Sequence, residues 1–178
     1  MAIVTLEAAK RQLNISQDDT SLDDELQLYV DAVGAAVEKA RGETIDRRTI
    51  VAEEVAARRS SFLLASVPIV SITSTVSVDG SQVWDPSDLR VDASSGMVTV
   101  ASGPAVSGAV LVTYTAGYDP VPAHYQLAAL IILQHLWETQ RGVMGVSLGG
   151  DGEPVMMPGF AIPRRALELL GLSIPGVA

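Results

Sequence analysis

Apolar residues near the N-terminus recur at intervals of three and four, which is the spacing of an amphipathic helix. We predict a short helix over residues 6–13, with Thr5 as its N-cap and Asn14 at its end. Its apolar face holds Leu6, Ala9 and Leu13.

The same spacing continues in a second, longer helix that we predict to end at Arg41, where Gly42 supplies a left-handed stop. Ser21, followed three residues later by Asp24, resembles a capping box that uses the shorter acid. The apolar positions of this helix are Leu22, Leu26, Tyr29, Val30, Val33, Val37 and Ala40.

From Arg47 the hydrophobic period shortens toward two, and Val, Ile, Thr and Ser become frequent, as in β-strands. Turn formers such as Asp79-Gly80 and Ser95-Gly96 separate the runs, so we predict antiparallel hairpins. The alternation in one run places Ile72, Val76 and Val78 on a common face. The predicted strands cover residues 49–57, 61–66, 71–79, 82–84, 89–92, 97–101 and 110–115.

A third helix is predicted from Ala123 to Arg141, and it is apolar nearly all round, so other elements or a neighbouring subunit must cover it. Residues 142–159 are rich in glycine and lack periodicity, which favours a long loop. Pro163 then begins a short last helix that Gly171 closes, followed by an apolar tail.

These elements predict an α+β fold: a small helical bundle with an antiparallel β-rich insertion between its second and third helices. The bundle has three main helices and a short C-terminal helix. The expected divisions are N-terminal helices in 1–46, the insertion in 47–116, the central helix in 117–142, and a loop with a C-terminal arm in 143–178.

Composition adds limits to this picture. The chain has 178 residues, of which 48% are hydrophobic, enough for one domain with a sizeable core. It has no cysteine, which excludes disulfides and thiolate chemistry and fits synthesis in a reducing cytoplasm. No apolar run is long enough for a membrane span, and no signal-peptide pattern is present, so we expect a soluble protein without a membrane partner.

The net charge of −9 makes tight DNA binding improbable, because phosphate affinity depends on clustered Lys and Arg. An acidic surface can line a DNA path, however, since like charge repels phosphates and gives the duplex nowhere to bind. The alternative is that the acidic surface only aids solubility.

Several patterns invite a chemical interpretation. Gly145-Val146-Ser147-Leu148-Gly149 satisfies the nucleophile-elbow pattern, but both histidines precede Ser147 and the segment lies in the glycine-rich loop. His124 and His135 lie roughly 16 Å apart on a helix with a rise of about 1.5 Å per residue, too far to share a metal.

Charged clusters have simple explanations too. The acids between Asp18 and Glu25 lack the order of a calcium-binding loop, so helix capping and solvation explain them. Arg47-Arg48 and Arg58-Arg59 are basic pairs rather than a patch. We expect them to support ion pairs between subunits or to protect strand edges. We therefore expect no catalytic residue, cofactor or metal.

Four segments together resemble a known family. Residues 112–122 read VTYTAGYDPVP and lead into a helix that contains HLWE at 135–138. The start at 1–13 and the stretches 67–80 and 85–100 precede them in the family's order. These segments resemble the head–tail connector (adaptor, head-completion) proteins of long-tailed bacteriophages, in a longer form with a β insertion. The 142–159 loop is longer than that family leads us to expect.

The resemblance implies a structural virion protein: a connector adaptor that forms a closed ring of about twelve copies beneath the portal. Such a ring extends the DNA channel, contacts passing DNA non-specifically and provides a docking surface for neck or tail components. The implied location is the neck of the virion, after synthesis in the cytoplasm of a bacterial host. The implied partners are further copies of the chain, the portal protein, and a neck- or tail-completion protein.

The resemblance also makes the C-terminal segment a candidate portal-binding arm, with the anchors Phe160, Ile162, Leu167, Leu170, Leu172 and Ile174. The alternative for this segment is that the last helix packs on its own domain. Two alternative functions stay open: a tail-terminator or other ring-forming neck protein, and, more remotely, a small hydrolase that uses the glycine-rich loop.

Overall fold

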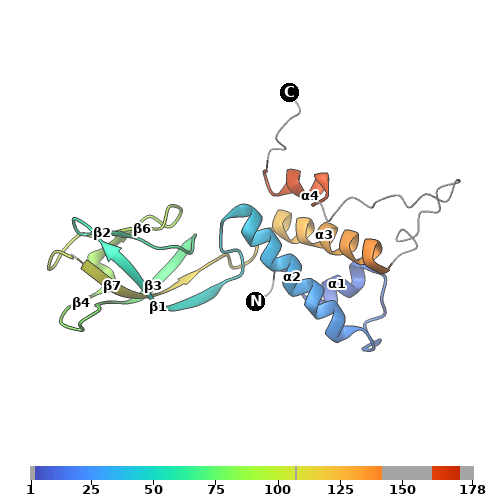
Figure 1. Ribbon diagram of the computed structural model, residues 1–178, viewed down its shortest axis with the longest axis horizontal. Coiled ribbons are helices and arrows are strands. Elements are labelled where there is room, and N and C mark those ends of the chain that lie inside the picture. Colours follow the sequence, from blue (N-terminus) through green and yellow to red (C-terminus); the bar gives the residue numbers. More distant parts are fainter. Residues whose placement is uncertain (1–2, 107, 142–161, 173–178) are drawn as a thin grey trace, which may run out of the picture. The chain divides into compact units, whose positions relative to one another are not determined.

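The computed structural model describes residues 3–106, 108–141 and 162–172 (Figure 1). Its contacts divide the chain into two compact units. Gly42–Pro120 forms a β unit, and Ala2–Arg41 together with Val121–Ala178 forms a helical unit. The α+β class with antiparallel sheets is therefore confirmed.

The helical unit contains α1 (Leu6–Gln12), α2 (Asp23–Arg41), α3 (Ala123–Arg141) and α4 (Arg164–Leu169). Thr5 caps α1 as predicted, because its hydroxyl oxygen accepts a hydrogen bond from the Ala8 N–H at 3.2 Å. Asn14 follows with a φ of 57°, in the left-handed region where asparagine is tolerated. The predicted helices at both ends of the chain are thus confirmed to within two residues.

The start of α2 differs from the predicted capping box. The Ser21 hydroxyl donates to Asp19 Oδ1 at 2.6 Å, and α2 begins at Asp23. Ser21 bonds to Asp19 instead of capping the helix, because a carboxylate two residues before a serine can accept from both its N–H and its hydroxyl in a tight local turn. The buried face of α2 keeps the predicted spacing, with Leu26, Val30, Val33 and Val37.

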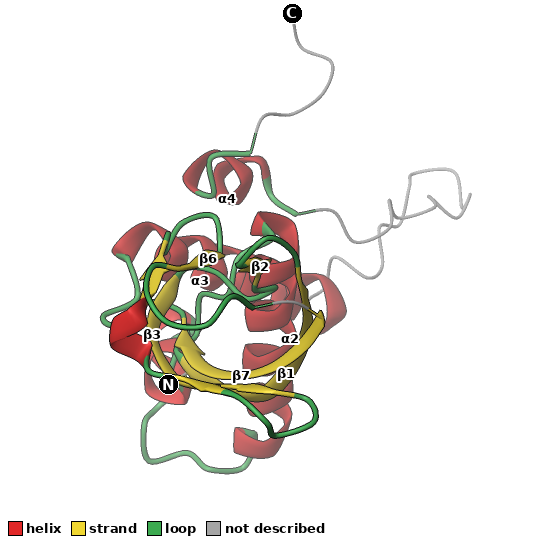
Figure 2. Cartoon of the chain, turned by 90° about the vertical axis from the view of Figure 1, so that its left-hand side faces the viewer, coloured by secondary structure: helices red, strands yellow, loops and turns green. Residues whose placement is uncertain are grey.

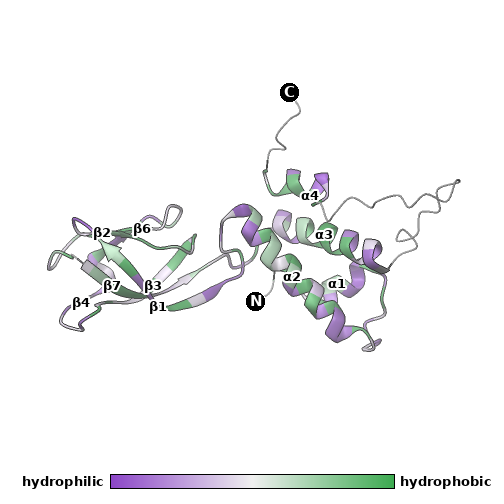
Figure 3. Ribbon diagram, viewed as in Figure 1, coloured by the Kyte–Doolittle hydropathy of each residue, from purple (hydrophilic) through white to green (hydrophobic). Residues whose placement is uncertain are grey.

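The centre of the helical unit is α3, which contacts each of the other three helices. Its apolar residues recur along most of its length (Figure 3). Not all of these apolar residues are covered, since Leu127 is 48% exposed. On the buried face of α3, the small residues Ala128 and Ala129 permit close packing of the neighbouring helices. Its buried residues are Tyr125, Ala128, Ala129, Ile132 and Leu133.

A buried lysine ties the loop between α1 and α2 to the helices. Lys10 is 4% exposed, and its ammonium lies 2.5 Å from Asp23 Oδ1 and 2.8 Å from the Asp19 carbonyl oxygen. A buried charge is tolerated when an opposite charge and further acceptors surround it. The acids between Asp18 and Glu25, which we expected to serve helix capping and solvation, therefore include one ion-pair partner of Lys10.

The β unit has two antiparallel sheets. The four-stranded sheet runs in the order β1 (Arg48–Ala57), β7 (Gly108–Ala116), β3 (Ile69–Ser77), β4 (Val83–Trp84). The three-stranded sheet has the order β2 (Ser61–Leu63), β6 (Met97–Val100), β5 (Leu89–Val91), and a short 3-10 helix, Pro86–Asp88, precedes β5. Figure 2 shows β2 and β6 on the opposite side of this unit from β1 and β7.

One apolar core lies between the two sheets and takes residues from both of them. β7 supplies every second residue, so Val110, Val112, Tyr114 and Ala116 are all fully buried. Val98 and Phe62 face them from the three-stranded sheet, and Trp84 of β4 lies on the same core face as the β7 residues. The indole N–H of Trp84 donates to the Pro104 carbonyl oxygen at 2.9 Å, which satisfies its polar atom.

Tyr114 connects this core to the loop after β2. Its hydroxyl donates to the Glu53 carboxylate of β1 and accepts from the Ser66 N–H at 3.1 Å. The other oxygen of Glu53 accepts from the Ala65 N–H at 3.2 Å. Burial, followed by the hydrogen bond to Glu53, raises the pKa of Tyr114 above its ordinary value.

Register shifts change which residues of β3 face the core. The pairing with β7 shifts between Ile69 and Ser71 and again between Ile72 and Ser74. Beyond the second shift Thr75 is fully buried, whereas Val76 is only half-buried and Val78 is 50% exposed. The predicted shared face of Ile72, Val76 and Val78 is therefore wrong, because an extra residue in one strand reverses the alternation that follows.

Candidate assembly surfaces

The C-terminal helix α4 packs against α3 in the helical unit. Ala166 is fully buried and Leu170, just after the helix, is 1% exposed. Arg41 at the end of α2 donates from Nη1 to the Leu170 carbonyl oxygen at 2.8 Å, and its guanidinium lies 5.8 Å from the centre of the Tyr125 ring. A cation at this position also satisfies a carbonyl that the helix leaves unpaired.

The six expected anchors of the portal-binding arm therefore fall into three groups. Leu170 lies in the core of its own unit, as the alternative of self-packing requires. Ile162, Leu167 and Leu172 are half-buried, so each keeps part of its apolar surface in contact with solvent. Phe160 and Ile174 lie outside the described residues, and so does the Gly145–Gly149 pattern with Ser147.

Four short turns of the form Asp-x-Ser recur along the chain, and each uses its carboxylate locally. The aspartate accepts from both the N–H and the hydroxyl of the serine two residues later. These hydrogen bonds favour the ionised form and lower the pKa of Asp19 and Asp85. The pKa falls to about 2 for Asp79 and Asp92, where the largest effects come from the hydroxyls of Ser77 and Ser95 and the serine two residues later adds to them. The four aspartates are Asp19, Asp79, Asp85 and Asp92.

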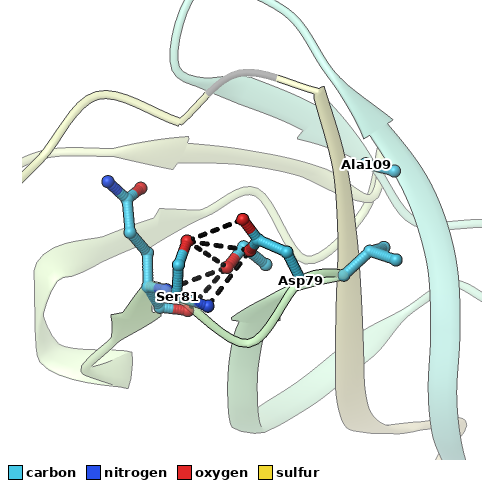
Figure 4. Close-up of a pocket in the computed structure, with 6 residues that line it drawn as sticks. Asp79, Ser81 and Ala109 are labelled. Carbon is cyan, nitrogen blue, oxygen red and sulfur yellow. Dashed lines mark hydrogen bonds between the residues drawn. The ribbon is translucent and has the colours of Figure 1, made fainter.

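One of these turns borders a shallow hollow of about 410 Å³ between β3 and β4 (Figure 4). Asp79 and Ser81 face each other across the turn, while Ala109 of β7 lies on the other wall. Because the Ser81 hydroxyl already donates to the Asp79 carboxylate, the hollow has the features of a hairpin turn rather than of a ligand site.

The histidines and arginine pairs lie apart from one another. His124 is exposed, and the centre of its ring lies 4.1 Å from the centre of the Tyr125 ring. His135 is half-buried and lies eleven residues further along α3. Arg47 pairs with Asp119 at 2.7 Å, within the β unit and not across subunits. In the described residues, no group of three His, Asp or Glu side chains is arranged to hold a metal ion.

Large apolar side chains are exposed on several strands and helices. The most exposed are Val51 at 74%, Leu28 at 70% and Val83 at 67%. Within the described residues, no helix is both long and apolar enough to cross a membrane. These side chains leave apolar surface that another protein can cover.

Comparison with known proteins identifies the family of the chain. The family model for head completion protein matches residues 2–172, so this chain belongs to the head completion protein family. That assignment confirms the resemblance to the connector and head-completion proteins and identifies a structural virion protein rather than an enzyme. No curated protein matches the chain.

Two solved assemblies contain chains of similar fold. A chain in the neck of an empty gene transfer agent particle, computed with C6 symmetry, superposes with a TM-score of 0.65 at 17% identity, covering 97% of this chain and 90% of that one. A chain in the virion of the native gene transfer agent particle gives a TM-score of 0.58 at 16% identity, with the same coverage. At such identities the likeness establishes a shared fold.

Proposed function

We propose that this protein is a head–tail connector adaptor of the virion neck, which forms a ring beneath the portal and carries the docking surface for neck or tail components. The observation that carries the proposal is the head completion family match over residues 2–172. The fold shared over 97% of the chain with a protein found in the neck of a gene transfer agent particle supports the same location.

A ring at this position continues the DNA channel. With 21 acidic and 12 basic residues, the chain presents phosphates with like charge on average. DNA can then pass with only non-specific contacts, because it meets no clustered Lys and Arg that would displace its counterions. The proposed ring has about twelve copies, and one heterologous interface repeats around its axis.

The proposed portal-binding arm is the segment 143–178. Leu167 and Leu172 are half-buried on α4 and after it, so portal can add to the apolar burial that these residues already have. Leu170 is already buried against its own unit, and it can reach a partner only if α4 leaves α3 and the Arg41 contact breaks. We therefore expect portal to bind the open side of a docked α4.

Electron microscopy of the purified protein with its cognate portal tests the proposal. We expect a ring stacked coaxially on the portal, and a chain truncated after Gly159 should lose it. A point variant separates loss of the arm from loss of folding: Leu167→Lys should weaken portal binding about tenfold or more, as expected for removal of one buried leucine.

Leu28→Lys is the matched control, because Leu28 is a 70% exposed leucine on α2 of the same helical unit. It should leave portal binding unchanged. Equal losses in both variants would remove the arm from the proposal. A full-length chain that ignores portal but binds tail-tube protein would instead identify a tail-terminator or another neck protein.

A further inference from the structure

The outer face of the four-stranded sheet carries an apolar patch that the core of the β unit does not explain. Val76 pairs in register with Leu111 on one side and with Val83 on the other, so these three residues form a row across β7, β3 and β4. The next row contains Ala56 and Ala109, which pair in register, and Val78, whose N–H donates to the Ala109 carbonyl oxygen.

Residues opposite one another in an antiparallel pair share a face, so all six side chains point away from the core. Val83 is 67% exposed and Val78 is 50% exposed. We call these six residues, Ala56, Val76, Val78, Val83, Ala109 and Leu111, the β4 patch. Glu54 lies at its border, because it pairs with Leu111 and is exposed.

Away from this patch, the regularly paired part of the face is polar, and the sheet's other exposed valines, Val51 and Val70, lie at the register shifts of β1 and β3. The hydroxyl oxygens of Thr49 and Thr115 lie 3.4 Å apart, and the Thr113 hydroxyl accepts from the Ala52 N–H at 3.1 Å. The row of neighbouring apolar pairs thus lies at the end of the sheet that holds the β3–β4 hairpin. A local apolar cluster with a polar surround is typical of an interaction site.

A second exposed apolar pair lies on the outer face of the other sheet. Leu63 and Met97 pair in register between β2 and β6, and they are 57% and 44% exposed. Their neighbours Phe62 and Val98 are buried, so the pair points away from the core. Arg90 lies on the same outer face, since it pairs with Thr99, two residues from Met97.

The charges at these two surfaces are complementary. Glu54 borders the β4 patch, and Arg90 lies beside the Leu63–Met97 pair without an ion-pair partner among the described residues. Asp92 is also near Met97, but the Ser94 and Ser95 hydroxyls donate to its carboxylate. Contact between two β4 patches would instead bring two copies of Glu54 and Asp79 together.

We propose that the β4 patch of one copy packs on the Leu63–Met97 pair of a second copy of this chain, with Glu54 facing Arg90. The inference rests on the proposed function, because it supplies a contact between neighbours in the ring. The two surfaces lie on opposite faces of one β unit, so the contact is head-to-tail and repeats from copy to copy. Each surface is small, and the assembly gains strength from repetition around a closed ring.

Thiol cross-linking tests the contact directly, because the natural chain has no cysteine. Full-length Val83→Cys and Leu63→Cys chains, one of them tagged, are mixed and treated with a short bis-maleimide. We expect heterodimers from the mixture and at most traces of dimer from either variant alone. The double variant Leu63→Cys with Val83→Cys should give a ladder of oligomers, since its two thiols lie on opposite faces and do not react within one chain.

Val51→Cys is the matched control for Val83→Cys. Val51 is a 74% exposed valine of the same sheet, but it lies outside the β4 patch in the irregular part of β1. It should give no cross-link with Leu63→Cys above background. An equal yield from the control, or efficient dimers of Val83→Cys alone, overturns the head-to-tail contact, as does the absence of a ladder both in the free protein and with portal.

Charge exchange gives a second measurement by sedimentation. Glu54→Arg and Arg90→Glu should each weaken self-association severalfold, and the combined variant should recover part of it, because the pair is restored with reversed sign. A combined variant weaker than both single variants contradicts the pairing. Portal binding without cross-links supports the proposed function and overturns this contact. Cross-links without portal binding support this contact and overturn the proposed function.

Discussion

Removal of the Tyr114 hydroxyl should be among the more damaging single-atom changes in the β unit. The residue is fully buried, and its hydroxyl donates to the Glu53 carboxylate while it accepts from the Ser66 N–H. Tyr114→Phe keeps the ring in the core and deletes only these two hydrogen bonds. A hydrogen bond to a charged group contributes about 1.5–3 kcal/mol, and a partly buried N–H without a partner adds about 1 kcal/mol.

We therefore expect Tyr114→Phe to lower the free energy of unfolding by about 2–4 kcal/mol. Urea unfolding monitored by the fluorescence of Trp84 reports on this unit, because Trp84 lies in its core. The only other tryptophan, Trp137, lies on α3 and is replaced by phenylalanine in every variant compared. The expected effect corresponds to a large fraction of the total stability of a domain this small.

The control is Tyr118→Phe in the same unit, where a half-buried tyrosine donates to Glu43 at 3.0 Å. Water can replace much of that interaction, so its loss should cost less than half as much. A double-mutant cycle with Glu53→Gln should give a coupling energy of about 1 kcal/mol or more with Tyr114. A cost equal to the control, or a coupling near zero, would refute the role of this network.

The same network has a pH signature on the alkaline side. The pKa of Tyr114 is raised from an ordinary value of 10.0, so the folded state holds its proton more tightly than the unfolded state does. The stability that this provides is complete below pH 10 and is lost as pH rises through the folded pKa. The difference in stability between wild type and Tyr114→Phe should therefore shrink above pH 10.

Three further predictions concern a buried threonine, two exposed turn aspartates and a glycine with positive φ. Thr75→Val should raise stability by about 1 kcal/mol in urea unfolding, because Thr75 is fully buried and its hydroxyl has no hydrogen-bond partner; a clear loss would reveal a partner. Asp79→Asn combined with Asp92→Asn should flatten the decline of stability from pH 4 to pH 2, since both carboxylates have pKa values near 2, below an ordinary 3.8, and lose their contribution as pH falls through those values; an unchanged slope contradicts this. Gly117→Ala should lower the free energy of unfolding by about 2 kcal/mol or more, because Gly117 has a φ of 112° and an added Cβ would lie 2.6 Å from the Arg47 Cα. The control Gly80→Ala, at a φ of 71° with open space around it, should lower it by only about 1 kcal/mol.

Local signals in the sequence were sufficient for most element boundaries. The cap at Thr5, the stop at Gly42 and the period-two runs depend on residues within a few positions, and the structure places elements within a few residues of each prediction. The last helix likewise begins just after Pro163 and ends before Gly171. These signals predict well because they act through backbone geometry that neighbouring residues alone determine.

Pairing and burial were harder to predict. A register shift in β3 depends on how that strand fits β7, and nothing in the run from 71 to 78 marks the extra residue. The consequence is large, because Thr75 enters the core while Val76 and Val78 turn outward. Likewise, the Asp19 turn that replaces the predicted cap at Ser21 is one of two reasonable local arrangements, and Lys10 favours it by bonding to the Asp19 carbonyl oxygen.

That same error in predicted register bears on assembly. A valine assigned to the core face contributes to folding of one chain, whereas the same valine on the outer face is available to another chain. The shift between Ile72 and Ser74 brings Val76 and Val78 into one outward patch with Val83. Removing the extra residue, by deletion of Thr73, should close the bulge and leave Ser74 opposite Thr113 and Thr75 opposite Val112, so Val76 and Val78 stay on the outer face. If the β4 patch is the contact between copies, a folded deletion variant should keep its cross-link through position 83, because Val76 still pairs with Val83 and Leu111. Loss of that cross-link in a folded variant would contradict the assignment of the contact to this patch.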